Sequence, residues 1–156
     1  MQIPKPTEAH RSLEKLEGQW MGEEIYDRSP LEPAGARCMV TFDFRRDMGG
    51  FYLIGEYAEK PTSERPQGLR GHMVIGFSPK EKTYTLHWFD NFGNPPAAPA
   101  KGTWKGDTIT FENHGEGHHG RTIFEVAGDA GLVFRVEMSA DGTKWSRTLE
   151  AKLKRR

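Results

Sequence analysis

The sequence has 156 residues, only one cysteine and no net charge. Because Cys38 has no partner, an internal disulfide is excluded. Its position in a strand-like segment between Arg37 and Met39 favours a buried, inert thiol over a nucleophile. Lysine and arginine together number 22, as do aspartate and glutamate. This balance excludes the strong positive field expected of a protein that binds nucleic acid or an anionic membrane.

Long apolar runs are also lacking. Residues 1–20 have no signal-peptide core, and no segment is apolar over the length needed to span a membrane. We therefore predict a cytoplasmic protein with neither nucleic acid nor membrane as a partner. The short basic end, Lys152 to Arg156, is better explained as a solvated terminus than as a phosphate site.

The motifs of common catalytic sites are missing as well. The sequence contains no Gly-x-Ser-x-Gly, no glycine loop that would cradle a phosphate, no His-Glu-x-x-His and no Cys-x-x-Cys. We accordingly assign no catalytic residue and no resident cofactor from sequence.

Glycine and aromatic residues are abundant: 18 Gly, 9 Phe, 4 Tyr and 4 Trp. This composition suits short strands joined by tight turns. Residues 1–6 should form an extended lead-in, after which Thr7 is a suitable N-cap for a short helix that Gly18 ends. Strand-like runs then cover residues 19–27, 36–45, 51–58, 69–77, 82–90, 100–105, 108–113, 120–126, 131–138 and 144–153. The pattern predicts an all-β fold, a single antiparallel up-and-down barrel of about ten strands over residues 7–156, with the helix closing one end.

Gly18, Trp20 and Gly22 open the first predicted strand. Neither glycine has a Cβ to obstruct the indole, so Trp20 can lie against the backbone and plug the closed end of the barrel. These three residues are predicted to be structural.

The connections differ in length between the two ends. The second, fourth, sixth and eighth connections are short hairpins. The odd-numbered connections lie at the other end of the barrel. Four of them, residues 28–35, 59–68, 91–99 and 114–119, are longer, and the last, residues 140–143, is tight. The sequence thus predicts a container with one plugged end and one mouth framed by loops.

Alternation along the strands predicts the interior lining. The residues expected to bind a ligand there are Glu24, Tyr26, Phe42, Phe44, Tyr84, Trp88, Asp90, Phe134 and Arg147. Arg147 could fork onto a ligand carboxylate, but an ion pair with Glu24 is the favoured interpretation. Asp90 could equally orient a polar headgroup or cap the loop that follows it.

Histidines cluster near the predicted mouth. His114, His118 and His119 are candidate metal ligands. They lie in a glycine-rich loop that does not preorganise them, so a solvated turn is the favoured interpretation.

The stretch Leu13-Glu14-Lys15-Leu16-Glu17-Gly18, followed by Trp20-Met21-Gly22-Glu23, is similar to the calycin superfamily of lipocalins, fatty-acid-binding proteins and nitrobindins. With Met48-Gly49-Gly50-Phe51 and Val74-Ile75-Gly76-Phe77-Ser78, it resembles most closely the bacterial domain-of-unknown-function family 1579 (DUF1579). The resemblance implies a barrel around a cavity and no established activity.

Nitrobindins hold haem through a histidine just before a Leu-x-Ala-x-Leu ending on the closing strand. This chain has the ending, Leu149-Glu150-Ala151-Lys152-Leu153, but Thr148 replaces the histidine, and a hydroxyl is no axial ligand for haem. The resemblance therefore argues against haem bound in that manner.

The interpretation that these features favour is a barrel that binds a small, largely apolar molecule, with room for a carboxylate or another polar headgroup. One alternative is a metal-dependent enzyme with His114, His118 and Asp90 at the mouth. Another is a homodimeric interaction module joined through exposed strand faces around Met73, Ile75 and Phe77.

Overall fold

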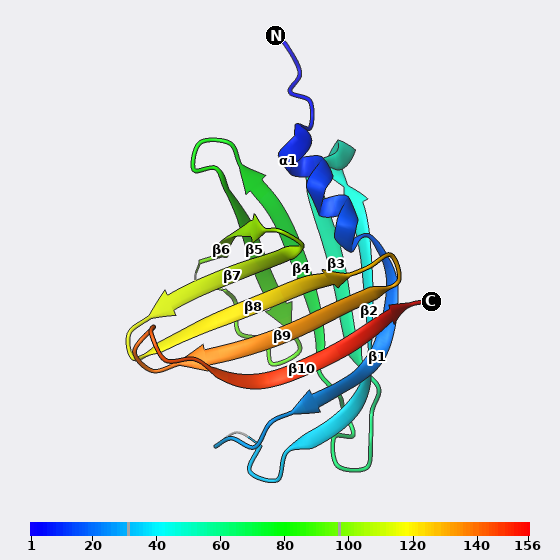
Figure 1. The fold of residues 1–156 in the computed structure, drawn as a ribbon, viewed down its shortest axis with the longest axis vertical. Coiled ribbons are helices and arrows are strands. Elements are labelled where there is room, and N and C mark those ends of the chain that lie inside the picture. Colours follow the sequence, from blue (N-terminus) through cyan, green and yellow to red (C-terminus); the bar gives the residue numbers. More distant parts are fainter. Residues whose placement is uncertain (31, 97) are drawn as a thin grey trace.

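The computed structural model describes residues 1–30, 32–96 and 98–156. Over these residues, ten antiparallel strands form a closed barrel in the order β1-β10-β9-β8-β7-β6-β5-β4-β3-β2 (Figure 1). Each strand pairs with its neighbours in sequence, and β1 pairs with β10 to close the barrel. The strands are β1 (Gly18–Tyr26), β2 (Ala36–Asp47), β3 (Tyr52–Glu59), β4 (Arg70–Ser78), β5 (Thr83–Asp90), β6 (Ala100–Lys105), β7 (Thr108–Gly115), β8 (His118–Ala127), β9 (Gly131–Ser139) and β10 (Ser146–Arg155). The predicted fold is confirmed.

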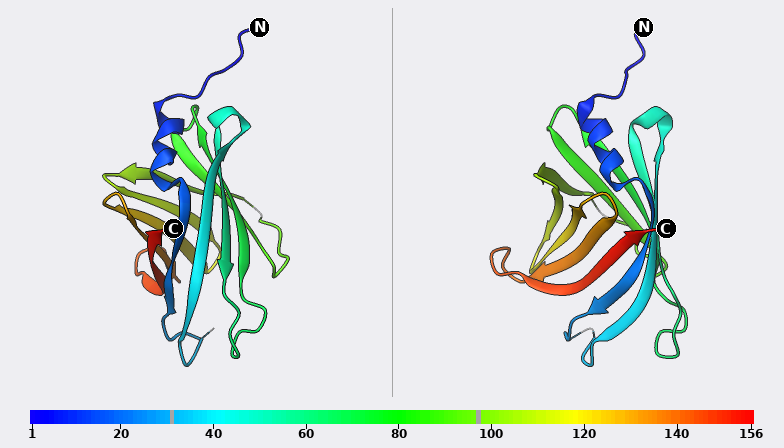
Figure 2. Two further views of the ribbon diagram at one scale, coloured as in Figure 1. Left: turned by 90° about the vertical axis from the view of Figure 1, so that its right-hand side faces the viewer. Right: turned by 45° about the vertical axis from the view of Figure 1, so that its right-hand side comes forward.

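A short helical segment covers one end of the barrel. It consists of an α-helical turn, α1 (Glu8–Arg11), and a 3-10 helix, η1 (Ser12–Leu16). It lies at the end where the β2–β3 and β4–β5 hairpins turn, away from the β1–β2 and β3–β4 connections (Figures 1 and 2). Leu13 and Leu16 are fully buried, and the Tyr84 hydroxyl donates to the Ala9 carbonyl at 2.8 Å. A helix this short is unstable alone, so these contacts hold it in place.

Trp20 plugs this end, although the flanking glycines make room for Arg155 and for the Lys152 backbone and not for the indole. The indole is 0 % exposed, and its Nε1 donates to the Leu16 carbonyl at 2.9 Å. The Arg155 guanidinium covers the ring at 4.2 Å from its centre. The plug therefore ties the helical segment, the first strand and the last strand together.

Gly22 allows the barrel to close. A Cβ on this residue would lie 1.9 Å from the Lys152 carbonyl oxygen of β10. The backbones of β1 and β10 can approach this closely only because no side chain stands between them.

Aromatic rings fill the half of the barrel nearest the plug. Phe42 and Phe44 stack at 5.6 Å between ring centres, and Phe124 and Phe134 stack at 5.2 Å. Phe42 also meets Phe134 edge-on at 5.0 Å. This packing fills the plugged half of the barrel, because inward-facing rings from different strands touch each other across it.

The structure settles the orientation of β3 and β4, which the alternation left open. Met73 and Ile75 are both 0 % exposed and belong to the core. The suggestion that these residues form an exposed dimer face is therefore wrong: every second residue of β4 points into the barrel, and both fall on that side.

Among the described residues, none of the helices is long and apolar enough to cross a membrane.

We predict that Gly22→Ala destabilises the protein by roughly 3 kcal/mol, because the new methyl group must push the backbones of β1 and β10 apart. Urea unfolding followed by tryptophan fluorescence measures the change. Met21→Ala is the control, since Met21 is 43 % exposed on the outer face, and should change stability by less than about 0.5 kcal/mol. Equal stability of the Gly22→Ala variant and the parent would contradict a tight seam.

Candidate functional site

A hollow of about 1700 Å³, open to solvent on one side, lies in the half of the barrel away from the plug. Its lining is mostly apolar and comes from β1, β3 to β10 and the β5–β6 connection. The lining residues used below are Tyr26, Tyr57, Trp88, Asp90, Arg121 and Phe134. A hollow of this size within a barrel can hold a small organic molecule.

The cavity is bounded on one side by the seam between β5 and β6. These strands pair only at Tyr84–Gly102, Thr85–Lys101 and Leu86–Ala100. Past Leu86, β5 continues through Trp88 and Asp90 without pairing to β6, and residues on both sides of this opening line the cavity. The loop after β5 and the β7–β8 hairpin contribute the remainder of the rim.

The predicted lining residues divide into two groups. Tyr26, Trp88, Asp90 and Phe134 do line the cavity. Glu24, Phe42, Phe44 and Tyr84 point inward but are packed into the solid part of the barrel, out of reach of the cavity. The alternation identifies the inner face correctly, but it does not show how far the core fills it.

The prediction that Arg147 points into the barrel and pairs with Glu24 is wrong. Its guanidinium makes a two-pronged ion pair with Asp27, Nε to Oδ2 at 2.6 Å and Nη2 to Oδ1 at 2.9 Å, and does not contact Glu24. The pairing of β10 with β9 shifts between Arg147 and Leu149, which is a β-bulge. The bulge breaks the alternation that put Arg147 on the same face as Leu149, so Arg147 lies outside the described lining of the cavity.

A buried polar network lies directly behind the cavity wall. The Tyr57 hydroxyl is 2.6 Å from Glu24 Oε1 and 3.2 Å from Glu59 Oε1, and the Tyr26 hydroxyl donates to the same Glu59 oxygen. Tyr57 has one hydroxyl proton and cannot give it to both carboxylates. The network is satisfied when Glu24 is protonated, since Glu24 can then donate to Tyr57 while Tyr57 donates to Glu59.

Arg65 pairs with Glu59. Its Nε donates to Glu59 Oε2 at 3.2 Å, and the backbone N–H of Leu69 donates to the same oxygen at 2.8 Å. The guanidinium also pairs with Glu32 and lies over the Tyr26 ring at 4.5 Å from its centre. The positive charge in the network therefore belongs to the Glu59 end, away from Glu24.

Burial raises the pKa of Glu24 to about 7, and the neighbouring Glu59 charge adds to this effect, against the lowering by the Tyr57 hydrogen bond. Glu24 is 0 % exposed, and its Oε2 has no hydrogen-bond partner among the described residues. Burial likewise raises the pKa of the Cys38 thiol to about 12. Cys38 is thus a buried and unreactive thiol, as predicted.

Glu24, Cys38 and Glu59 also form a set of three potential metal ligands, with atoms within 4.8 Å of one another. Arg65 is already bound to one of these groups, and Glu24 holds a proton near neutral pH, so both compete with a cation at this position.

The histidines predicted at the mouth lie on the β7–β8 hairpin. His114 and His118 line the rim of the cavity. His114 and His119 face each other, Nδ1 to Nδ1 at 2.7 Å, and His114 Nε2 is 3.1 Å from Glu112. Asp90 borders the same cavity, but it accepts hydrogen bonds from Trp88 and Phe92 and not from a histidine.

Asp90 caps the loop that follows it and also borders the cavity, where it could meet a polar headgroup. Its Oδ2 accepts from Trp88 Nε1 at 2.7 Å, and its Oδ1 accepts from the Phe92 backbone N–H at 3.0 Å. It therefore caps the following loop and fixes the indole that lines the cavity. Trp88 also lies on Gly71, where a Cβ would come within 2.3 Å of the ring.

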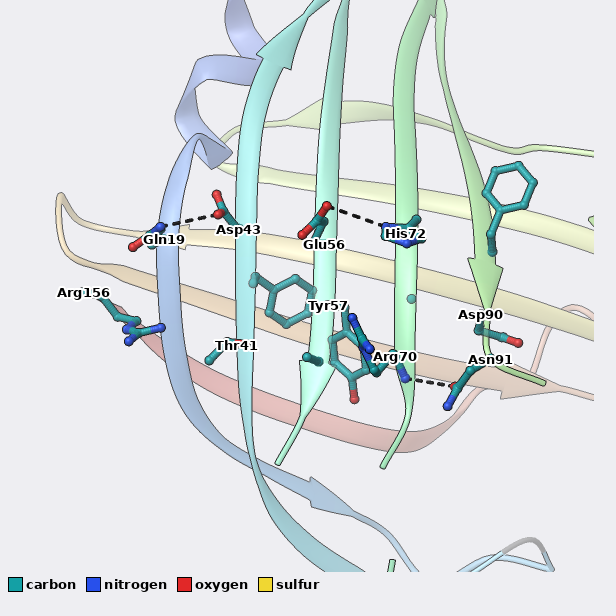
Figure 3. A pocket seen from close by; sticks show the side chains of 14 residues that line it. Gln19, Thr41, Asp43, Glu56, Tyr57, Arg70, His72, Asp90, Asn91 and Arg156 are labelled. Atoms are coloured by element: carbon teal, nitrogen blue, oxygen red, sulfur yellow. Dashed lines mark hydrogen bonds and ion pairs between the residues drawn. The ribbon is translucent and has the colours of Figure 1, made fainter. Parts of the chain in front are cut away.

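A second hollow of about 520 Å³ lies on the outer face of β1 to β5 (Figure 3). Some of its polar groups pair with each other: Gln19 with Asp43 at 3.4 Å, and His72 with Glu56 at 4.0 Å. These are exposed side chains in contact with water, so the larger and more apolar hollow in the barrel is the stronger candidate site.

Sequence reasoning missed Tyr57, Glu59 and Arg65. Tyr57 and Glu59 lie on β3, where both faces are partly apolar, and Arg65 lies in a loop. An available signal was the inward spacing of Tyr57 and Glu59 after Gly55, but only the register of β2 with β3 shows which face is inside.

Comparisons with known proteins agree with this fold. A family model described as "Protein of unknown function (DUF1579)" matches residues 5–155. Nothing among the curated proteins matches the sequence. Rv2717c from M. tuberculosis has a similar structure, with a TM-score of 0.71 and 16% identity over 96% of this chain and 98% of that one. The S-type phycobiliprotein lyase CPES from Guillardia theta is also similar, with a TM-score of 0.62 and 10% identity over 97% and 98% of the two chains.

We predict that Glu24 makes the protein less stable as the pH rises. Below pH 4.5 its carboxyl is neutral in both the folded and the unfolded chain. Between pH 4.5 and about 7 the unfolded chain loses this proton first, so the free energy of unfolding falls by about 3 kcal/mol from this group. Glu24→Gln should remove that fall, which unfolding in urea at pH 4.5, 6 and 8 measures.

Glu23→Gln is the control for this substitution, because Glu23 is the next residue along β1 and pairs with Arg37 on the exposed face. Its stability relative to the parent should not change by more than about 0.5 kcal/mol across the same range. A Glu24→Gln variant whose unfolding free energy runs parallel to that of the parent at all three pH values would show that Glu24 does not hold the extra proton.

Proposed function

Because the chain belongs to the DUF1579 family of proteins of unknown function, whose model spans nearly its whole length, its function must be argued from its own cavity; we propose that it binds a small, largely apolar molecule inside the barrel. The observation that carries the proposal is the 1700 Å³ hollow in one half of a barrel whose other half is solidly packed. Small single-domain proteins rarely leave such a volume unfilled without use for it.

The lining supports an apolar ligand held by a few polar groups. Rings and aliphatic side chains make most of its surface, and burial of apolar area is the main source of affinity for such ligands. Polar atoms of Asp90 and of the tyrosines at the inner wall would orient the molecule. The similarity to a phycobiliprotein lyase, at 10% identity, supports the fold and does not transfer an activity.

The shape of the rim supports a route for entry. The unpaired part of β5 and the connection after it border the cavity, so a ligand could enter there without breaking a paired strand. The plugged end offers no comparable route among the described residues, since Trp20, Leu13 and Leu16 fill it.

We predict that filling the cavity abolishes binding. N-phenyl-1-naphthylamine, a neutral apolar dye that brightens when removed from water, is the probe. Val136→Trp places an indole in the cavity from β9 and should weaken dye binding at least tenfold, because it takes the volume that the dye needs.

Val133→Trp is the matched control, since it makes the same substitution on the same strand but on the opposite face, where Val133 pairs with Lys152. It should leave dye binding within about twofold of the parent. Absence of dye binding to the parent protein, or equal binding by both variants, would overturn the proposal. If the dye binds as expected, native mass spectrometry of the protein purified from its own host would identify the molecule retained.

A further inference from the structure

The cavity has an inner wall formed by aromatic rings. Tyr57 and Phe134 both pack on Phe42 of the solid core, with ring centres 5.0 Å away in each case, so these two rings form the floor of the cavity. Trp88 stands against Tyr57 at 5.7 Å and forms the adjoining wall, and Tyr26 also faces the cavity. Four rings from β1, β3, β5 and β9 thus meet around one end of the hollow.

Each polar ring in this group has a carboxyl group at its edge. The Tyr57 hydroxyl lies 3.2 Å from Glu59 Oε1 and donates to it when Glu24 is protonated, the Tyr26 hydroxyl donates to the same oxygen, and Trp88 Nε1 donates to Asp90 Oδ2 at 2.7 Å. A hydrogen bond donated to a carboxylate moves electron density onto the ring. It therefore strengthens the negative potential at the ring face that attracts cations.

The charges around these rings favour a cation. The carboxyl groups of Glu59 and Glu32 behind the wall and of Asp90 in the lining are set against one guanidinium, that of Arg65, while a protonated Glu24 adds no charge. Arg65 itself lies on one face of Tyr26, which shows that these rings accept a positive charge.

Two of the basic side chains that line the cavity elsewhere are already engaged. Arg121 binds Glu112 at 2.7 Å and covers the Trp145 ring, and Lys101 binds Glu81 at 2.8 Å. Both lie on the β6 to β8 side of the cavity, opposite the carboxyl groups of β1 and β3. An anionic headgroup that bound Arg121 or Lys101 would have to displace one of these pairs, whereas a cation can rest on the rings without breaking any.

We infer that the ligand of this cavity carries a positively charged nitrogen, of the quaternary ammonium or protonated amine class, and that this nitrogen sits against Tyr57, Trp88 and Phe134 while the apolar part of the molecule fills the remaining volume. The inference rests on the proposed function and adds to it the charge of the ligand. Aromatic rings around a desolvated cation are a known means of recognising such groups.

Two probes of the same shape test this inference. Phenyltrimethylammonium has a positively charged nitrogen where tert-butylbenzene has a neutral carbon. A third probe, benzenesulfonate, carries a negative charge. The dissociation constants of all three, measured by NMR titration, should show tighter binding of phenyltrimethylammonium than of the other two. Asp90→Asn and Tyr57→Phe should each weaken binding of the cation about fivefold, with binding of tert-butylbenzene unchanged within twofold.

Asp43→Asn is the control, because it removes a carboxylate from the outer face of β2. It should leave all three affinities as they are in the parent. Preferential binding of tert-butylbenzene or benzenesulfonate would overturn the inference, as would a preference for the cation that neither cavity variant reduces. If N-phenyl-1-naphthylamine binds in those cases, the proposed function stands while the charge assignment fails. If none of the four probes binds, both fail.

Discussion

The close contact between the first and last strands is the constraint on which this structure depends. At Gly22 the backbone of β1 comes so near to β10 that a single methyl group would overlap the Lys152 carbonyl. Gly102 permits a similar approach to Thr110 on the opposite side of the barrel. These two narrow positions allow an antiparallel sheet to curl fully on itself, and a closed sheet is what separates an interior from solvent.

The closed interior then divides into a solid half and a hollow half. Rings of phenylalanine fill the first, up to a floor formed by Tyr57 and Phe134. Polar groups occur at this boundary because the tyrosines can bury their rings toward the core and still direct their hydroxyls to carboxyl groups in the wall. Because the Tyr57 hydroxyl has one proton for two carboxyl groups, Glu24 keeps a proton of its own near neutral pH, which links the stability of the barrel to pH.

The relatives of this chain share its barrel without defining its use. Similar barrels occur in proteins that share only 10% to 16% of its sequence, so the residues of the interior have to be judged individually. Thr148 illustrates this, because the resemblance to nitrobindins places it where those proteins have their haem ligand, and a hydroxyl does not serve in that role. In this chain the interior carries carboxyl groups paired to Tyr26, Tyr57 and Trp88.

The sequence by itself determined the ten strands, the helical lid, the plug at Trp20 and the buried thiol of Cys38. These depend on local alternation, turn residues and capping, which are readable over a few neighbouring positions. Only the tertiary structure decided that Arg147 turns outward at a bulge, that Phe42 and Phe44 pack into a solid core, and that Glu24 meets Tyr57, a residue 33 positions away in the chain. Strand register and the filling of space depend on contacts between distant segments, and local sequence patterns do not encode which of those contacts will form.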